Sequence, residues 1–244
     1  MYDYKKSKER VEGILKSPTK IIEKDSIPSS DSEFTYENGI KAWVAALFVD
    51  IVDSSELFES ADENTARIIR SFCSEIIAIL RDDSKYREIG IRGDCVYCIY
   101  SVKTKEDLVE IFRHAYRINT FIKMLNKLLT KHNYPNISAG IGLGCSQDLI
   151  VKAGQNGSGI NDKVWIGRAA VDAAHLSDVA NRNYISEIAM SLLFYENIIE
   201  LLTEENENYK TWIKSHAGSY YGSIDYYHCN IIETGFNEWI EENL

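Results

Sequence analysis

The sequence predicts an α+β fold with a ferredoxin-like βαββαβ core, in which helices cover one face of an antiparallel sheet. From residue 42 onward, apolar runs and helical patterns follow one another in the order strand, helix, strand, strand, helix, strand. Two of the predicted strand segments end on a carboxylate, Asp50 in the first strand and Asp94 in the central hairpin. Because the first strand of this topology lies beside the hairpin, we expect the two carboxylates to be neighbours.

The N-terminal segment is predicted to stand before this core. Residues 3–16 carry apolar side chains at helical spacing, and Ser17-Pro18 is a stop signal for that helix. Residues 24–38 are rich in Ser, Asp and Glu, a composition typical of a linker. We therefore expect residues 1–38 to form a helix and linker, with the core beginning near Gly39.

The first half of the core contains a strand, a helix and a hairpin. The apolar run over residues 42–52 predicts a buried strand, and apolar residues recur at helical spacing over residues 62–82. Asp62 is placed to cap that helix. Residues 87–101 alternate as a hairpin does, with its turn at Gly93-Asp94.

A long helix begins the second half of the core. Its apolar positions repeat over residues 105–131. Residues 137–153 are predicted to form two strands, joined at Ser146-Gln147-Asp148 because these are turn-forming residues. A further helix is predicted over residues 168–180.

The C-terminal part is predicted to extend the core with β and helical segments. We expect a short strand at residues 187–191, a helix over residues 192–214 and a Tyr-rich β segment over residues 219–232. The main domain would then span residues 39–232, and residues 233–244 would form a C-terminal tail.

Charge and apolar content exclude several classes of partner. The formal net charge of −10 argues against binding to nucleic acid or to an anionic membrane surface, since both require a basic surface. The N-terminus has no apolar signal-peptide region, and no apolar run is long enough to span a bilayer. We expect no direct membrane insertion.

The cysteines indicate a reducing compartment. Their count is five, an odd number, and most lie in apolar runs. Cys95 and Cys98 form a C-x-x-C motif, but residues three apart on a strand point to opposite faces, which argues against a shared zinc ion. Reduced thiols are typical of a cytoplasmic protein.

Carboxylates at strand ends need a partner. A buried ionised carboxylate is costly unless it is paired or binds a metal. Asp50 and Asp94 together suit Mg²⁺ or Mn²⁺, hard ions that proteins commonly share with substrate phosphates. The backbone N–H groups of Ile51, Val52, Asp53, Ser54 and Ser55 lead towards a helix and would suit phosphate oxygens.

Structural roles for the same aspartates stay open. Taken alone, Asp50 would serve as a helix cap or turn residue at a strand end, and Asp94 as part of an ordinary Gly-Asp hairpin turn. Taken together in this topology, the two favour a metal site. Asp53 is better placed to cap the following helix than to bind metal. A haloacid-dehalogenase-type phosphatase site is disfavoured, because it requires Asp-x-Asp where this chain has Asp-x-x-Asp.

Four segments resemble the class III nucleotidyl cyclases over roughly residues 40–192. They are Phe48-Val49-Asp50-Ile51-Val52-Asp53-Ser54-Ser55, Ile91-Arg92-Gly93-Asp94-Cys95-Val96, Ser138-Ala139-Gly140-Ile141-Gly142-Leu143-Gly144 and Trp165-Ile166-Gly167-Arg168-Ala169-Ala170-Val171-Asp172-Ala173-Ala174-His175-Leu176. The resemblance implies a homodimer with active sites at the subunit interface. It also implies that Asp50, Asp94 and the carbonyl of Ile51 bind two Mn²⁺ or Mg²⁺ ions. A nucleoside triphosphate would be cyclised through its 3′-hydroxyl, with release of pyrophosphate.

The late helix departs from the family pattern. The positions of the usual Asn and of the Arg that stabilises the transition state align with Val171 and His175. Arg168 lies on the same helical face as His175 and would supply the missing positive charge. An ion pair between Arg168 and Asp172, four residues apart on the surface, is an equally good interpretation.

The base pocket departs from the purine cyclases. The Lys that adenylate cyclases carry four residues before the second aspartate is replaced by Gly90, and Arg92 lies two residues before Asp94. Together with the C-terminal tail, this resembles the pyrimidine cyclases of bacterial Pycsar antiphage systems, which make cyclic UMP or cyclic CMP. Tyr36 is a candidate base contact, although packing at the domain edge is the simpler role.

The resemblance therefore implies a cytoplasmic uridylate or cytidylate cyclase whose product activates a separate effector protein. Uridylate is favoured over cytidylate. A purine cyclase remains an alternative, as does a degenerate cyclase domain that senses nucleotides, since the Asn/Arg pair is missing. A diguanylate cyclase is disfavoured because its Gly-Gly-Asp/Glu-Glu-Phe signature is absent from the sequence.

Overall fold

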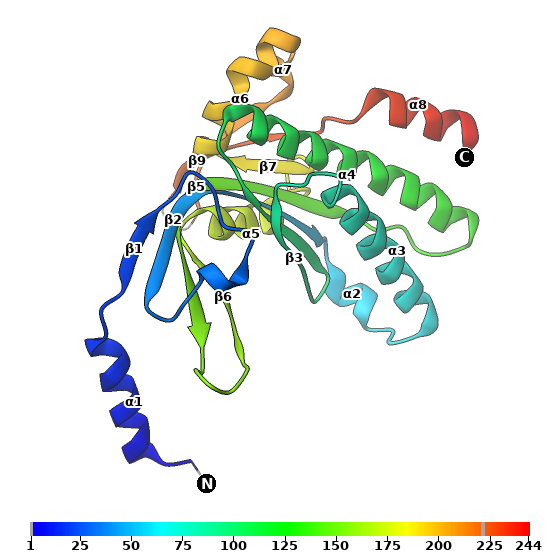
Figure 1. Ribbon diagram of the computed structural model, residues 1–244. Helices are drawn as coiled ribbons and strands as arrows, with labels where there is room; N and C mark the ends of the chain where they lie inside the picture. The colour runs from blue at the N-terminus through cyan, green and yellow to red at the C-terminus, as the bar shows by residue number, and fades with distance from the viewer. Residues whose placement is uncertain (1, 221–222) are drawn as a thin grey trace.

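A computed structural model, which describes residues 2–220 and 223–244, confirms the α+β fold with its ferredoxin-like core (Figure 1). The core elements are β2 (Asn38–Ile51), α3 (Glu63–Leu80), β3 (Tyr86–Arg92), β4 (Cys95–Ser101), α4 (Lys105–Lys131) and β5 (Ala139–Gly154). Their strands lie in the order β3-β4-β2-β5. Strand β2 therefore pairs with the hairpin, as expected, and lies antiparallel to both β4 and β5.

Further elements extend this core at both ends of the chain. They are α1 (Tyr4–Lys16), β1 (Lys20–Glu23), the 3₁₀ helix η1 (Asp31–Glu33), α2 (Ser54–Phe58), β6 (Asn161–Ile166), α5 (Ala169–Val179), β7 (Ile188–Ser191), α6 (Leu192–Glu205), α7 (Tyr209–Trp212), β8 (Lys214–Tyr220), β9 (Ser223–Cys229) and α8 (Thr234–Asn243). The strands of the described residues form one sheet, in which β7, β9 and β8 follow β5. Strand β1 pairs with β2, and β6 pairs with β5.

Strand β5 is continuous, so the prediction of two strands over residues 137–153 was wrong. Its pairing with β2 runs without interruption from Ala139 to Val151. Asp148 is not a turn residue: its side chain is fully buried and accepts hydrogen bonds from the backbone N–H groups of Arg168 and Ala169. It therefore caps the N-terminus of α5, a role that turn propensity alone does not reveal.

The C-terminal helix prediction was too long. Helix α6 ends at Glu205, and the last residues of the predicted range 192–214 form the short α7 and the start of β8. Strand β8 then pairs with β9, which falls inside the predicted Tyr-rich β segment. Residues 221 and 222 of that segment lie outside the described part of the chain.

The segment predicted as a linker is packed against the core. Ile27 and Phe34 are buried, and the backbone N–H of Ile27 donates to the hydroxyl of Ser101. Strand β1 also pairs in parallel with the start of β2. The division of the chain into residues 1–38, 39–232 and 233–244 stays a prediction.

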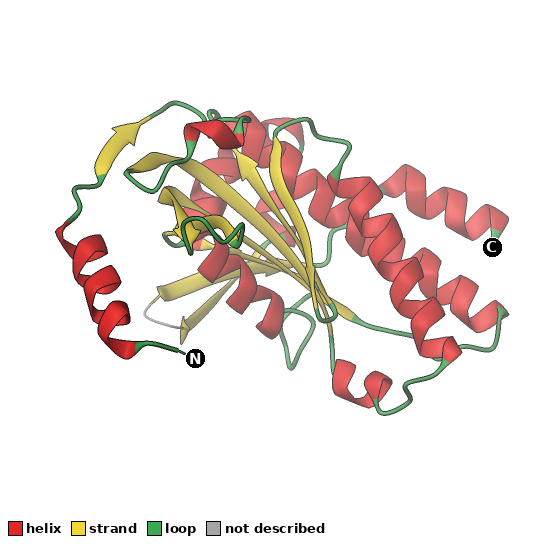
Figure 2. Cartoon of the chain, turned by 60° about the horizontal axis from the view of Figure 1, so that its bottom comes forward, coloured by secondary structure: helices red, strands yellow, loops and turns green. Residues whose placement is uncertain are grey.

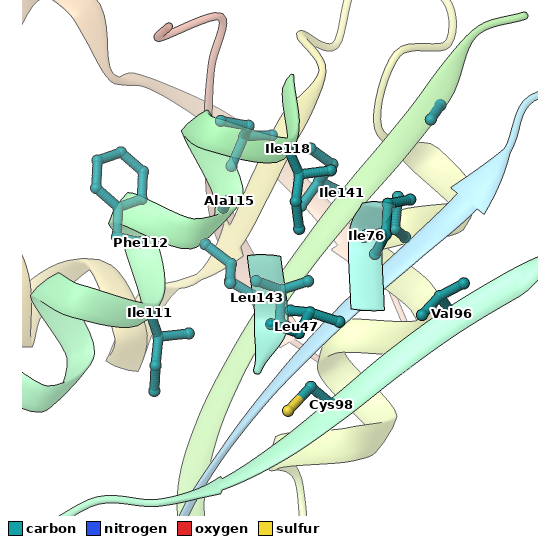
Figure 3. Packing of buried hydrophobic residues seen from close by; sticks show 14 of the residues in the cluster. Leu47, Ile76, Val96, Cys98, Ile111, Phe112, Ala115, Ile118, Ile141 and Leu143 are labelled. Atoms are coloured by element: carbon teal, nitrogen blue, oxygen red, sulfur yellow. The ribbon is translucent and has the colours of Figure 1, made fainter. Parts of the chain in front are cut away.

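Helices cover both faces of the sheet, where the sequence predicted one covered face (Figure 2). Alternate residues of β2 explain this. Leu47 and Val49 face the apolar core formed with α3, α4 and α6, whereas Ala42 and Ala46 face the cluster that contains α5. Both faces of β2 are therefore buried, and its sequence is a nearly continuous apolar run. Figure 3 shows the first core, with Leu47 and Leu143 of the sheet beside Ile76 of α3 and Ile118 of α4.

Helix α5 lies directly on the backbone of β5. Alternate β5 residues facing the helix are Gly140, Gly142 and Gly144. A Cβ atom added at Gly142 would lie 1.9 Å from the carbonyl oxygen of Ala173, a distance that no side chain tolerates. Glycine is therefore required here by close approach of a helix.

Helix α1 extends away from the body of the molecule (Figure 1). It has no buried residue, and Asp3 caps its N-terminus by accepting from the N–H groups of Lys5 and Lys6. No helix in residues 2–220 or 223–244 has both the length and the apolar character needed to cross a bilayer.

Replacing one of the β5 glycines tests the contact with α5. We expect Gly142→Ala to lower the free energy of unfolding by about 2–4 kcal/mol, because the backbone atoms it would strike belong to a helix and cannot rotate away. Urea denaturation measures this. Gly235→Ala is the matched control, since a Cβ at Gly235 meets nothing within 4 Å. Equal stability of the two variants would contradict the close packing of α5.

Candidate active site

A cleft of about 640 Å³ lies where β2, β4 and β6 meet α5. Its walls carry carboxylates, a guanidinium and aromatic rings on different elements. The lining residues that matter to the chemistry are Asp50, Asp178, Cys95, Arg92, Glu88, Phe48, Tyr97 and Trp165. Asp50 is therefore in a concave site, which is the usual setting of a reactive carboxylate.

Asp50 is held in a costly environment. Burial first, and then the nearby charges of Asp94 and Asp178, raise the pKa of its carboxyl from 3.8 to about 6. The guanidinium of Arg182 opposes this, with its Nη2 atom 3.5 Å from Oδ2 of Asp50. A group whose ionised form is destabilised and which faces a cleft is a candidate functional residue.

Asp94 approaches Asp50 as the topology predicted. The pKa of the Cys95 thiol is raised to about 12, first by burial and then by the charges of Asp50 and Asp94. Both carboxylates are therefore near the same thiol. Asp94 lies in the turn between β3 and β4, where Gly93 adopts a left-handed φ of 66°. The two aspartates come from segments brought together by the β2–β4 pairing.

The two carboxylates fit a metal ion that is shared with a substrate. Carboxylate oxygens are the ligands that Mg²⁺ and Mn²⁺ prefer. Among the described residues, no group of three or more His, Cys, Asp or Glu side chains forms a complete metal site. The remaining ligands would have to come from backbone, water or substrate phosphates, as is common for Mg²⁺.

An aromatic wall bounds the cleft beside the carboxylates. The rings of Phe48 and Tyr97 stack with centroids 5.1 Å apart. Glu88 fixes this wall, since one carboxylate oxygen accepts from the Tyr97 hydroxyl at 2.7 Å and the other from the Trp165 indole at 2.9 Å. The wall is therefore held together by hydrogen bonds and formed by four strands, β2, β3, β4 and β6.

The position of the missing lysine is occupied. A Cβ atom at Gly90 would lie 2.4 Å from the ring of Tyr97. Tyr97 therefore covers Gly90, and no side chain fits there without moving the ring. The absence of Lys at this position is a packing requirement of the aromatic wall.

Comparisons with known proteins place the chain in a family. A uridylate cyclase from Treponema porcinum is 43% identical over 245 residues, which cover 100% of this chain and 82% of that protein. The chain belongs to the uridylate cyclase family. A uridylate cyclase from Gulbenkiania mobilis is 29% identical over 253 residues, 99% of this chain and 97% of that protein. No protein-family model matches the sequence.

Solved structures confirm the class III cyclase fold. The adenylyl cyclase CyaB from P. aeruginosa has a TM-score of 0.63 at 15% identity, covering 78% of this chain and 95% of that one. The guanylyl cyclase Cya2 has a TM-score of 0.63 at 10% identity, covering 82% of this chain and 97% of that one. The uridylate cyclase relatives confirm the predicted resemblance to nucleotidyl cyclases and the expectation of an enzyme of that type.

The structure separates the expected phosphate-binding segment from the cleft. Ile51, Val52 and Asp53 line a second cavity of about 580 Å³, whereas Ser54 and Ser55 line neither cavity. The N–H of Val52 already donates to the carbonyl of Ser138 at 2.9 Å. That amide is therefore engaged within the protein.

Asp53 occupies the N-cap position of α2 without capping it. Its backbone is left-handed, with a φ of 54°, and its side chain makes no capping hydrogen bond. The prediction that its side chain caps the helix was wrong, because the left-handed backbone is incompatible with the usual extended N-cap geometry.

Two predicted site residues lie on α5. Nη2 of Arg168 is 2.6 Å from Oδ1 of Asp172, so the ion pair weighed as an alternative is present. His175 lies on the same helix and is half-buried. Neither residue is among those that line the cleft.

Tyr36 lies away from the cleft. Its hydroxyl is buried without a hydrogen-bond partner among the described residues, and Nζ of Lys152 lies 5.6 Å from the ring centroid. Arg92, by contrast, does line the cleft. Cys95 faces the cleft and Cys98 the opposite core, as expected for residues three apart on a strand.

Several residues that line the cleft or contact Asp50 were missed from the sequence. They are Glu88, Tyr97, Trp165, Asp178 and Arg182. No short motif joins them, because they converge from β3, β4, β6, α5 and the loop after α5. The only sequence signal was the alternation of the hairpin strands, which places Tyr97 on the same face as Cys95.

The raised pKa of Asp50 predicts how its replacement changes stability. Between about pH 4 and pH 6 the folded state binds more protons than the unfolded state, so ionised Asp50 destabilises the fold above pH 6. We expect Asp50→Asn in EDTA to raise the free energy of unfolding by about 1–3 kcal/mol at pH 8. The gain should disappear near pH 4. Urea denaturation at three pH values tests this, and a gain independent of pH would contradict the burial of the charge.

A double-mutant cycle tests the packing of Gly90 against Tyr97. We expect Gly90→Ala to cost about 1–3 kcal/mol of stability, because the added methyl meets a ring fixed by Glu88. In a Tyr97→Ala background the same substitution should cost little. Thermal denaturation of the four proteins gives the coupling. Equal costs in both backgrounds would show that the ring does not cover Gly90.

Proposed function

We propose that this protein is a pyrimidine nucleotide cyclase that converts UTP to 3′,5′-cyclic UMP and pyrophosphate. The observation that carries the proposal is 43% identity, over the whole chain, to a uridylate cyclase. The occupied Gly90 position supports it, since the cleft has no room there for the lysine that the resemblance associates with a purine. CTP is the alternative pyrimidine substrate.

Asp50 and Asp94 would bind two Mn²⁺ or Mg²⁺ ions, with the carbonyl of Ile51 as a further ligand. Asp50 lines the cleft, and the charge of Asp94 is close enough to raise the pKa of Asp50. This proximity supports the role. When bound, such ions activate the attacking hydroxyl and stabilise the leaving pyrophosphate. The protein's part is to hold the carboxylates at a fixed place on adjoining strands.

Other predicted residues would contact the substrate. Val52, Asp53, Ser54 and Ser55 lie outside the cleft but follow Asp50 and Ile51 in the chain, and would approach the phosphates from there. Arg92, in the cleft, would contact the base. Arg168, His175 and Tyr36 lie outside the cleft of their own chain. They would act across a subunit interface, on a site completed by a second copy.

A homodimer is supported by apolar side chains near the mouth of the cleft. Val164 and Ile166 of β6 and Val171 of α5 are 42%, 51% and 40% exposed. Val164 also lines the cleft. A second copy of the chain would cover these residues and bring its own α5 to the site.

The cellular role follows from the product. A separate effector protein would bind the cyclic pyrimidine nucleotide, in antiphage defence, as the sequence resemblance implies. The five cysteines are free thiols. This supports a place in the reducing cytoplasm.

Incubation with UTP, CTP, ATP and GTP in Mn²⁺, followed by product identification, tests the proposal. We expect cyclic UMP as the main product. Asp50→Ala and Asp94→Ala should each lower turnover roughly a hundredfold or more, because each removes a metal ligand. Asp82→Ala is the matched control, an exposed aspartate paired with Arg117 at 3.5 Å and remote from the cleft.

Three results would decide against the proposal. A clear preference for ATP or GTP would make the protein a purine cyclase. Tight nucleotide binding without product, in any divalent metal, would make it a degenerate cyclase domain that senses nucleotides. Full activity of Asp50→Ala would remove the carboxylate from the reaction.

A further inference from the structure

Arg182 is a cation at the active site that no sequence motif indicates. It lies in the loop between α5 and β7, three residues after the end of the helix. Its Nη2 atom is 3.5 Å from Oδ2 of Asp50, and both side chains are mostly buried, at 26% and 19% exposure. No other ion pair to Asp50 occurs among the described residues.

The loop holds this guanidinium from the opposite side. Nη1 donates to the carbonyl oxygens of Ser177 at 3.1 Å and Ala180 at 3.3 Å, at the C-terminal end of α5. Such carbonyls attract a cation. Arg182 therefore bridges the end of α5 and Asp50.

The backbone around Arg182 is fixed in an uncommon conformation. The flanking residues Asn181 and Asn183 both have a φ of 55°. The side-chain amide of Asn181 donates to the carbonyl of Ala139 on β5, at 3.1 Å. The loop thus aims the guanidinium at the end of β2 instead of at solvent.

The charges that would surround Asp50 differ between the empty site and a site that holds metal and triphosphate. In the chain alone, the charges of Asp94 and Asp178 act on Asp50, and Arg182 is the neighbouring cation that stabilises its ionised form. Metal ions bound to Asp50 would repel this guanidinium, whereas the triphosphate that accompanies them would attract it. Arg182 would therefore oppose the binding of metal ions and favour the binding of the triphosphate.

We infer that Arg182 is a positioning residue that exchanges partners, from Asp50 in the ligand-free site to the triphosphate in the loaded site. It competes with the metal for Asp50 when metal is present alone. It favours binding when metal and triphosphate come together. Arg182 thereby couples the two binding events. This inference rests on the proposed function, since it assumes that the cleft takes a metal and a triphosphate.

Two binding measurements test it, and neither requires turnover. The first is Mn²⁺ affinity in the absence of nucleotide, followed by the EPR signal of free Mn²⁺. We expect Arg182→Gln to bind Mn²⁺ about threefold to tenfold more tightly, because a competing cation is gone. The second is the affinity for inorganic tripolyphosphate at saturating Mn²⁺, which we expect to fall about tenfold through loss of a charge-assisted contact.

Matched variants separate this role from a structural one. Arg182→Lys keeps the charge and should stay within about threefold of the wild type for Mn²⁺. Arg113→Gln removes a similarly exposed arginine, paired with Glu110 and Glu205 away from the cleft, and should change neither affinity. Thermal denaturation of each variant checks the fold.

The inference requires that Arg182→Gln raise the affinity for Mn²⁺ and lower the affinity for tripolyphosphate. If Arg182→Gln weakens both affinities, the residue only supports the loop. If it changes neither, or only the Mn²⁺ affinity, partner exchange is wrong. A wild-type protein that binds no Mn²⁺ would overturn both this inference and the metal site. Intact Mn²⁺ and tripolyphosphate binding without turnover of UTP would count against the proposed substrate alone, since tripolyphosphate has no base.

Discussion

The contact between α5 and the backbone of β5 is the constraint on which the active site depends. Gly140, Gly142 and Gly144 present no side chain to the helix, so carbonyl oxygens of α5 lie where their Cβ atoms would otherwise be. This closeness brings the C-terminal end of α5 to the end of β2, the neighbour of β5. Asp178 and Arg182 reach Asp50 only because no larger residue holds the helix away.

The resulting cluster of charges is unstable by itself and is suited to a cation for that reason. Burial and neighbouring carboxylates raise the pKa of Asp50, whereas Arg182 stabilises its ionised form. If the carboxylates were fully neutralised by cations of the protein, the site would have little affinity for a metal ion. If no cation were present, the buried carboxyl would be protonated near neutral pH. One partly buried arginine among three aspartates lies between these limits.

Much of the fold could be predicted from the sequence, because the hydrophobic period separates strands from helices. The end of β2 at Asp50 and the hairpin turn at Asp94 follow from local pattern plus the βαββαβ order. Asp148 could not be predicted, since a buried cap and a turn residue use the same side chain. Arg182 was missed for a different reason. It contacts Asp50 at the end of β2 and backbone carbonyls of α5. Asp50 is far from Arg182 in the sequence, and no short motif joins the two.

The aromatic wall shows how base preference can follow from packing. Glu88 uses both carboxylate oxygens to hold Tyr97 and Trp165, and the Tyr97 ring then covers Gly90. A lysine at residue 90 would need a different tyrosine position, which would leave an oxygen of Glu88 without its donor in a partly buried cleft. Changing one base contact therefore requires changing three residues on two strands together. A preference built in this way resists single substitutions, because each intermediate loses packing or a hydrogen bond before it gains a new contact.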